Sequence, residues 1–276
     1  MQMVLGELDT DAAPVDLTSY DVVLVNSSAG KDSQAMLDYI AELAHAAGVA
    51  DRVVVFHADL GRVEWDGTAE LAQEHAAHYG FRFIKLAKAR LDLLERVEER
   101  GSWPDAARRW CTSDFKRAVS YRVLTQLAAE RRDAGHTGPI RVLNCMGLRA
   151  EESPARAKKL AFRHDPNASN GRRHVDEWLP ILHWTVGDVW ARIAAAGTRA
   201  HEAYALGMPR LSCSFCVLSS KNALIRAAQL RPNLAAEYAA VEARIGHKFR
   251  QNLSMADIIE AAKTADATAP IDGWNH

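Results

Sequence analysis

The clearest chemistry in this sequence lies in a short loop of small residues that contains one lysine. It follows an apolar run at 21–25 and reads Asn26-Ser27-Ser28-Ala29-Gly30-Lys31-Asp32-Ser33. A helical pattern begins directly after it. Backbone N–H groups and a helix N-terminus bind phosphate at such a junction. The order of residues differs from the G-x-x-x-x-G-K-[ST] loop of kinases and GTPases. The loop therefore predicts a phosphate site of another kind.

Each residue type in the loop has a role that phosphate binding would use. The hydroxyls of Ser28 and Ser33 can donate hydrogen bonds, and Gly30 allows the backbone to approach closely. Lys31 supplies a mobile positive charge for departing pyrophosphate. Asp32 either holds the start of the helix or reaches Mg²⁺. The alternative is a capped strand-to-helix turn that happens to contain a lysine.

Cysteines supply the second candidate site. Cys213 and Cys216 form a C-x-x-C pair, which brings two thiolates to one metal centre, and thiolates favour zinc or iron–sulfur clusters. Cys111 is a third ligand candidate. Cys145 either supplies a fourth ligand or, because it lies in an apolar strand, is an inert core residue. The remaining alternatives are a redox dithiol pair and buried cysteines without chemistry.

Two further segments follow predicted strands. His57 and Asp59 come at the end of the apolar run 52–57, where they could line an adenosine pocket, although Asp59 could equally cap a turn. After the run 141–146 come Gly147, Arg149 and Arg156. Arginine makes forked contacts with phosphate oxygens, so these two side chains are candidate phosphate ligands.

The elements that position these residues alternate between strand and helix. We expect strands at 21–26, 52–57, 81–85 and 141–146, and helices at 33–47, 66–79 and 114–131. This order predicts an α/β fold with a doubly wound parallel sheet, whose ligands bind beyond the strand C-termini. The polar stretch 163–173 is expected to be a loop. Thr185 and Asp188 are expected to cap a helix, and 221–265 is expected to be mainly helical.

Composition sets the broad class. The 276 residues are 48% hydrophobic and 25% charged, with a net charge of −1, as in an ordinary soluble globular protein. Because no apolar stretch has the length of a membrane span, we expect a cytoplasmic protein without a membrane partner. We expect a flexible arm at 1–19, a nucleotide domain at 20–185 and a helical region carrying the C-x-x-C pair at 186–276. Oligomeric state is left open.

The loop resembles the S-G-G-K-D-S loop of the PP-loop ATP pyrophosphatase superfamily. Three further segments, 109–116, 145–156 and 204–216, resemble motifs of the phosphoadenosine phosphosulfate (PAPS) reductase-like branch of the adenine nucleotide alpha hydrolases. The resemblance covers about residues 20 to 220. It implies a five-stranded parallel sheet of the HUP type and cleavage of ATP to AMP and pyrophosphate. It also implies that Lys31, Asp32 and Arg149 are catalytic.

The cysteine pattern separates two branches of this family. PAPS reductases carry a C-terminal E-C-G-L-H tail, whereas this sequence has no cysteine after Cys216 and no adjacent Cys-Cys pair. We therefore favour a resemblance to the ATP pyrophosphatases of Dnd- and Ssp-type DNA phosphorothioation systems. The alternatives are PAPS or adenylylsulfate reduction, tRNA thiolation and a non-enzymatic nucleotide-binding regulatory module.

This resemblance implies a set of cofactors and partners. The cofactors would be ATP, Mg²⁺ and a [4Fe–4S] cluster, with zinc as the alternative to the cluster. A cysteine desulfurase would be the sulfur donor. Because the chain has no overall positive charge, DNA would be presented partly by partner proteins.

Overall fold

One twisted sheet organises the first two thirds of the chain. The computed structural model describes residues 15–271 and has a sheet in the order β3-β2-β1-β4-β6-β5. The strands are β1 (Val22–Asn26), β2 (Val53–Asp59), β3 (Arg82–Ala87), β4 (Ile140–Met146), β5 (Phe162–His164) and β6 (Arg173–Trp178). Five of them are parallel, and β5 pairs antiparallel to β6. The predicted fold class is confirmed, with an antiparallel edge strand added to the five parallel strands.

The central strands are apolar because helices cover both of their faces. Val23 of β1 lies opposite Val53 of β2 and Leu143 of β4, and all three side chains are buried. Strands buried on both faces read as continuous β-branched and aliphatic runs, which is why the sequence located them closely.

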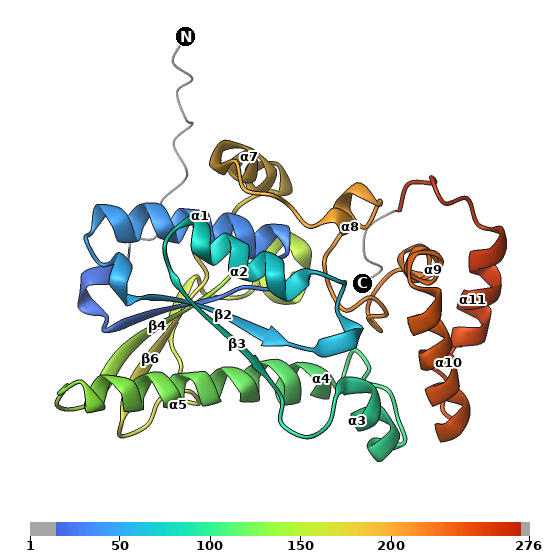
Figure 1. Cartoon of the computed structure of the whole chain (residues 1–276), viewed down its shortest axis with the longest axis horizontal. Helices are drawn as coiled ribbons and strands as arrows, with labels where there is room; N and C mark the ends of the chain where they lie inside the picture. The colour runs from blue at the N-terminus through green and yellow to red at the C-terminus, as the bar shows by residue number, and fades with distance from the viewer. Residues whose placement is uncertain (1–14, 272–276) are drawn as a thin grey trace, which may run out of the picture.

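Helices form a layer on each face of this sheet. Figure 1 shows α1 (Lys31–Ala46) and α2 (Thr68–His78) on one face and α5 (Ala118–Asp133) on the other. Residues of α7 (Val186–Ala196) share the core of the α1 face, and residues of α5 share the core of the opposite face. Thr185 caps α7 by accepting from the Asp188 N–H at 3.1 Å, as predicted.

A second core lies beyond the carboxyl ends of the parallel strands. It joins α3 (Leu93–Arg100), which the sequence analysis missed, to α9 (Lys221–Leu230), α10 (Pro232–Ile245) and α11 (Met255–Thr264). The arrow of β2 points toward this region in Figure 1. The helices expected between 221 and 265 are present. The short helix α8 (Glu202–Ala205) leads into the loop that carries Cys213 and Cys216.

The loop predicted at 163–173 is present at 165–172, but its two ends are strand residues. Its first residues belong to β5 and its last residue begins β6, with a turn between them. Polar pairs hold the two strands together: Arg163 lies opposite Glu177 and bonds it at 2.9 Å, and His164 lies opposite Asp176. Because charged side chains do the pairing, the strands lack the apolar pattern that identifies a strand in a sequence.

The predicted helix at 114–131 is part of a longer helical segment. It begins with α4 (Trp110–Thr112), passes through a π-helical turn at Ser113–Arg117 and continues as α5. A π turn holds one residue more than an α turn and often occurs beside functional sites. Cys111 lies just before it.

The predicted arm at 1–19 is only partly described, because residues 1–14 lie outside the described range. Residues 15–19 pack on the sheet: Leu17 is buried, and Arg52 Nη1 donates to the carbonyls of Thr18 and Tyr20 at 2.9 Å each. Residues 15–19 are therefore part of the packed fold. Across residues 15–271, no helix is both long enough and apolar enough to cross a bilayer.

Candidate functional site

The phosphate loop joins the end of β1 to the first turn of α1. Gly30 caps the helix, and its carbonyl accepts from Ser33 Oγ at 2.9 Å. The same hydroxyl oxygen accepts from the Ser28 N–H at 3.1 Å, and Ser27 Oγ accepts from the Ala29 N–H at 3.3 Å. The loop is thus shaped by its own serine hydroxyls. The N–H groups of a first helical turn have no partner within the helix, and an anion can bind them; in α1 the Lys31 N–H already donates to the Tyr204 hydroxyl at 2.8 Å.

Ala29 stands where the S-G-G-K-D-S loop has its first glycine, and the structure shows how an alanine fits there. Its φ is +54°, in the left-handed region that glycine enters without strain. An alanine there costs roughly 1–2 kcal/mol. The methyl group is fully buried against Leu71 and Ala72 of α2, and this packing offsets part of that cost.

Lys31, Asp32 and Arg149 form a buried charge cluster at the helix N-terminus. Lys31 Nζ lies 3.1 Å from Asp32 Oδ2, and Arg149 Nε lies 2.6 Å from Asp32 Oδ1. Burial lowers the pKa of Lys31, an effect that the charge of Asp32 opposes. Burial would raise the pKa of Asp32, but the two cations outweigh it and the pKa is lowered. Both Asp32 oxygens pair with cations, so Asp32 would have to release one of them to reach Mg²⁺.

Gly147 lets the β4 loop approach this cluster. A Cβ at Gly147 would lie 2.9 Å from the carbonyl oxygen of Asp32 and 3.0 Å from Ser33 Cα. Both contacts are with backbone, which cannot move aside cheaply. This close approach brings Arg149, two residues later, to Asp32.

Two more arginines share one carboxylate beside the cluster. Arg156 bonds Glu152, and Arg210 Nη2 lies 3.0 Å from Glu152 Oε1. Burial, together with the charges of Arg210 and Arg109, lowers the pKa of Arg156 to about 10. Like charges gathered in this way are stabilised by an anion. The candidate phosphate ligands Lys31, Arg149 and Arg156 therefore lie in one region of the structure.

His57 and Asp59 take local roles. The His57 imidazole is 1% exposed, with Nδ1 3.0 Å from the Ser27 carbonyl and Nε2 3.1 Å from Glu64 Oε2. Burial opposes protonation of the ring, but these contacts outweigh it and the pKa of His57 is raised. Asp59 accepts from the Gly61 N–H at 2.8 Å, which is the turn-cap alternative. His57 supports the phosphate loop from beneath.

Tyr204 is a site residue that the sequence analysis did not single out. Its hydroxyl accepts from the Lys31 N–H at 2.8 Å, and Lys31 Nζ lies 5.9 Å from its ring centroid. Burial raises its pKa to about 12, so the hydroxyl stays protonated. A Cβ at Gly30 would lie 3.4 Å from both the Tyr204 hydroxyl and Leu211. Tyr204 opens the 204–216 motif, and that motif was the available signal.

Three cysteines gather next to the phosphate loop. Cys111 comes from α4, and Cys213 and Cys216 come from the loop after α8, which is tied to the β2 side by the Ser214 N–H donating to the Val63 carbonyl at 2.9 Å. Burial raises the pKa of Cys111, and the nearby Cys216 adds to the shift. Burial also raises the pKa of Cys213, to about 12. All three cysteines are free.

Cys145 lies elsewhere. It is completely buried in β4, in the core shared with α1, whereas Cys111 and Cys213 pack against the second core. Its thiol donates to the Leu143 carbonyl at 3.9 Å, and burial raises its pKa. The structure therefore corrects its assignment as a fourth ligand and supports the alternative, an inert core cysteine.

Arg210 connects the two sites. Burial lowers its pKa, and the neighbouring charges of Asp32 and Cys216 oppose that shift. The pKa of Arg210 is thus affected both by the Asp32 carboxylate at the phosphate loop and by Cys216. The two candidate sites are neighbours in space, although Lys31 of the phosphate loop and Arg210 are 179 positions apart in the sequence.

The cysteine loop has the chemistry of a soft-metal centre. Its thiols lie in apolar surroundings, and the charge of Lys116 opposes the effect of burial on the pKa of Cys213. A metal centre would remove the thiol protons that burial retains. Zn²⁺ bonds thiolates at about 2.3 Å, which puts two sulfurs on one ion roughly 3.8 Å apart. Among residues 15–271, only His164, His174 and Asp176 have three ligand atoms all within 4.8 Å. The three sulfurs are thus spread more widely than one zinc ion needs.

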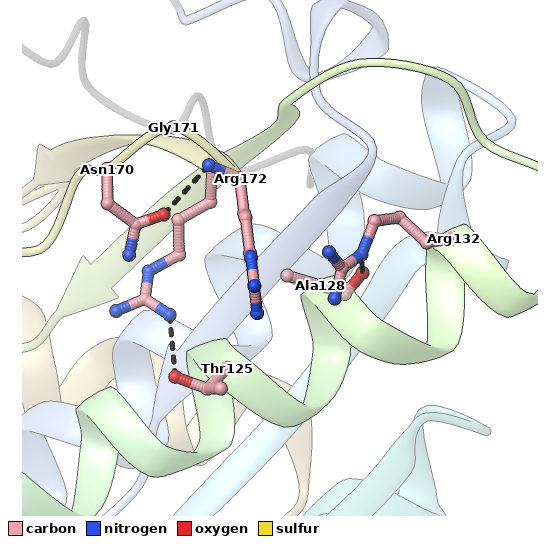
Figure 2. Close-up of a pocket in the computed structure, with 7 residues that line it drawn as sticks. Thr125, Ala128, Arg132, Asn170, Gly171 and Arg172 are labelled. Atoms are coloured by element: carbon pink, nitrogen blue, oxygen red, sulfur yellow. Dashed lines mark hydrogen bonds between the residues drawn. The ribbon is translucent and has the colours of Figure 1, made fainter.

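A separate cavity lies on the α5 face of the sheet. Figure 2 shows this hollow of about 310 Å³ between α5 and the turn that precedes β6, with Arg132 and Arg172 at its wall. Arg173 Nη1 donates to Thr125 Oγ1 at 2.7 Å across it. None of the predicted site residues lines this cavity.

The fold and site together define an α/β nucleotide-binding domain with a phosphate loop at the switch point and cysteines beside it. The model of the phosphoadenosine phosphosulfate reductase domain matches residues 22–219. The chain therefore belongs to the phosphoadenosine phosphosulfate reductase domain family.

Individual relatives are more distant. An uncharacterized 37.8 kDa protein of Escherichia phage 186 is 30% identical over 125 residues, which cover 45% of this chain and 34% of that protein. The chain thus spans about a third of that relative's length. The phosphoadenylyl-sulfate reductase of Candida auris is similar in structure, with 18% identity, a TM-score of 0.46 and coverage of 71% of this chain and 83% of that one. The U34-tRNA thiolase NcsA of Methanococcus maripaludis, solved with its [4Fe–4S] cluster, is 11% identical with a TM-score of 0.43. The match covers 94% of this chain and 78% of that one.

Proposed function

We propose that this protein is an ATP pyrophosphatase that adenylates a phosphate oxygen so that sulfur can replace it. The observation that carries the proposal is the contact between the segment 204–216, which contains Cys213 and Cys216, and the phosphate loop: the Tyr204 hydroxyl accepts from the Lys31 N–H at 2.8 Å. A nucleotide site and a sulfur site that are joined in this way are suited to consecutive steps on one substrate. The proposed setting is DNA phosphorothioate modification of the Dnd or Ssp type.

The first step forms AMP from ATP. A phosphate oxygen of the acceptor attacks the α-phosphorus, the new oxygen–phosphorus bond forms, and the bond to the β-phosphate oxygen breaks. Pyrophosphate leaves with the electron pair. Lys31 and Arg149 stabilise the charge that develops on it, and electrostatic stabilisation of this kind commonly contributes most to the rate acceleration of an enzyme. Mg²⁺ would enter with the nucleotide phosphates.

The second step replaces the activated oxygen. Sulfur at the oxidation level of sulfide attacks the adenylated phosphorus, and AMP leaves with the oxygen. Cys111, Cys213 and Cys216 would hold a [4Fe–4S] cluster, which supplies a site for sulfur binding and delivery. A cysteine desulfurase is the proposed sulfur source. A persulfide from it reaches the sulfide level with two electrons from thiols.

The charges around the loop suit a polyanionic acceptor. Arg109 is exposed, and its charge acts on the half-buried Arg156, so positive charge extends outward from the phosphate loop. The net charge of the whole chain is nevertheless −1. Local phosphate contacts without an overall positive field favour delivery of DNA by partner proteins.

Product analysis tests the first step. ATP labelled at the α-phosphate is incubated with anaerobically purified protein, Mg²⁺, DNA and the sulfur source. We expect DNA-dependent formation of AMP and pyrophosphate. Lys31→Ala should slow it about 10²–10³-fold, and Lys263→Ala, which removes an exposed lysine of α11, should leave it unchanged.

Other products would redirect the proposal. ADP and inorganic phosphate would contradict cleavage between the α- and β-phosphates. Sulfite released from PAPS or adenylylsulfate with thioredoxin would assign the protein to sulfonucleotide reduction. AMP formation that depends on tRNA and ignores DNA would assign it to tRNA thiolation. ATP binding that the biological function does not need would indicate a regulatory module.

A further inference from the structure

A cluster of two histidines and one aspartate lies on the β5–β6 pair. His164 of β5 lies directly opposite Asp176 of β6, and His174 precedes Asp176 by two residues on the same strand. Side chains two residues apart on a strand share a face, as do cross-strand partners. The sheet itself therefore brings all three side chains to one surface. None of them takes part in the proposed ATP chemistry.

The geometry of the cluster is convergent. His164 Nδ1 lies 3.2 Å and His174 Nε2 lies 3.1 Å from the same oxygen, Asp176 Oδ1. The two imidazoles stack with ring centroids 4.2 Å apart, so both ring edges point toward one place. The three ligand atoms all lie within 4.8 Å of one another.

We propose that His164, His174 and Asp176 bind a divalent transition-metal ion, with Zn²⁺ as the best match. Two imidazole nitrogens and one carboxylate oxygen are a common protein ligand set for such ions. Tetrahedral bonds of about 2.0–2.2 Å put neighbouring ligand atoms roughly 3.3 Å apart. The observed nitrogen–oxygen separations already approach this value. Small side-chain rotations would place the ion between the three atoms.

The surroundings of the cluster support an ion rather than hydrogen bonds alone. Tyr20 donates to the other carboxylate oxygen, Asp176 Oδ2, at 2.9 Å. An outer hydrogen bond of this kind orients a ligating carboxylate. The Asp176 side chain is 7% exposed, whereas His164 and His174 are 43% and 49% exposed, so an ion can enter from solvent. The guanidinium of Arg141 lies over the Tyr20 ring, 5.0 Å from its centroid, and packs the tyrosine that holds Asp176 Oδ2.

The consequence of binding would be structural. β5 is a three-residue antiparallel strand at the edge of the sheet. A metal ion bonded to both β5 and β6 would fix this edge, and Tyr20 would tie it to the N-terminal segment. The C-terminal edge of the parallel strands, where the phosphate loop lies, is separate from this cluster. The ion would therefore affect stability without entering catalysis.

Zinc content and thermal melting of the full chain test the proposal. After dialysis against Zn²⁺ and removal of free metal, His164→Gln and His174→Gln should each hold one zinc equivalent fewer than wild type. Excess Zn²⁺ should raise the wild-type Tm by roughly 5 °C and leave both variants unchanged. His183→Gln, which removes an exposed histidine outside the cluster, should behave as wild type.

Cobalt separates this site from the cysteines. Co²⁺ bound by nitrogen and oxygen gives visible ligand-field bands without the near-ultraviolet charge-transfer band of thiolate ligation. We expect such bands in Cys213→Ser protein and their loss when His174→Gln is added. The proposal is overturned if the two histidine variants bind as much zinc as wild type, or if wild type holds zinc only through cysteines.

Discussion

The phosphate loop and the cysteine loop lie side by side but are stabilised in different ways. The phosphate loop is one continuous segment whose serines bond its own backbone and whose charges are paired, as in Lys31–Asp32–Arg149. The cysteine site is assembled from two segments about 100 residues apart, Cys111 and the loop with Cys213 and Cys216, and it packs against an apolar core.

This difference separates preorganisation from ligand-dependent order. The phosphate loop has its shape before any nucleotide binds, because backbone and side-chain hydrogen bonds fix it. In the cysteine site, burial raises the pKa of Cys111 and Cys213, so a metal centre would be needed to hold these two thiols in their charged form. Mutations in the first loop should act on rate, and mutations in the second should act on cofactor content.

The largest effect should come from removing the cation of the phosphate loop. Lys31→Ala is expected to slow AMP formation about 10²–10³-fold, because the leaving pyrophosphate loses its buried counter-charge. Quench-flow measurement of labelled AMP checks this. Iron content should match wild type, and a parallel loss of iron would break the distinction between the two loops.

Cofactor content should respond to the cysteines alone. Cys213→Ser is expected to lose the iron and acid-labile sulfide of anaerobically purified protein and to abolish sulfur transfer. AMP formation should fall less than about tenfold, because the phosphate loop is shaped without the cysteine loop. Cys145→Ala is the matched control and should retain iron, since Cys145 lies in the other core. Stoichiometric zinc without iron in wild type would contradict the cluster.

A smaller effect is expected at Gly147. Gly147→Ala places a methyl group against the Asp32 backbone and should cost about 1–3 kcal/mol of stability. This corresponds to a Tm lower by roughly 3–10 °C. Gly171→Ala is the control, since a Cβ there meets nothing within 4 Å. Equal Tm values for the two variants would show that the loop after β4 can move away from Asp32, which would contradict the prediction.

The smallest effect concerns pH. Both partners of His57, the Ser27 carbonyl and the Glu64 carboxylate, are acceptors, so the ring bonds both only when protonated. Its raised pKa stabilises the fold below about pH 6.5, and this contribution is lost as pH rises through the folded value. We therefore expect the free energy of unfolding to fall as the pH rises from about 6 to about 8. In Glu64→Gln this fall should be absent. Urea unfolding at the two pH values measures it.

Local features were predictable from the sequence, and the contacts between distant segments were not. The phosphate loop and the buried strands were located closely because β-branched runs and helix starts are local signals. The β5–β6 pair was missed because Arg163–Glu177 and His164–Asp176 hold it with charges. The contact of Tyr204 with Lys31 joins residues 173 positions apart, and no local pattern encodes such a contact.

The cysteines show the same limit from another side. Spacing identified the C-x-x-C pair and the motif around Cys111. It left two roles open for Cys145, because an apolar strand can either present a side chain at its end or bury it. The structure places this thiol fully inside the core of the α1 face. Burial depends on which helix covers the strand, and that is a property of the whole fold.

The π turn at Ser113–Arg117 sets the direction in which α4 faces relative to α5, although the two helices form one continuous helical segment. Each α-helical residue turns the chain by about 100°, so an inserted residue rotates the residues before it relative to the residues after it. Deleting one residue of the turn would restore a regular helix. The face of α5 against the sheet would stay in place, while Cys111 would swing about a quarter turn away from Cys213 and Cys216. The extra residue thus rotates Cys111 about the helix axis, so that Cys111 faces the cysteine site while α5 keeps its apolar face on the sheet.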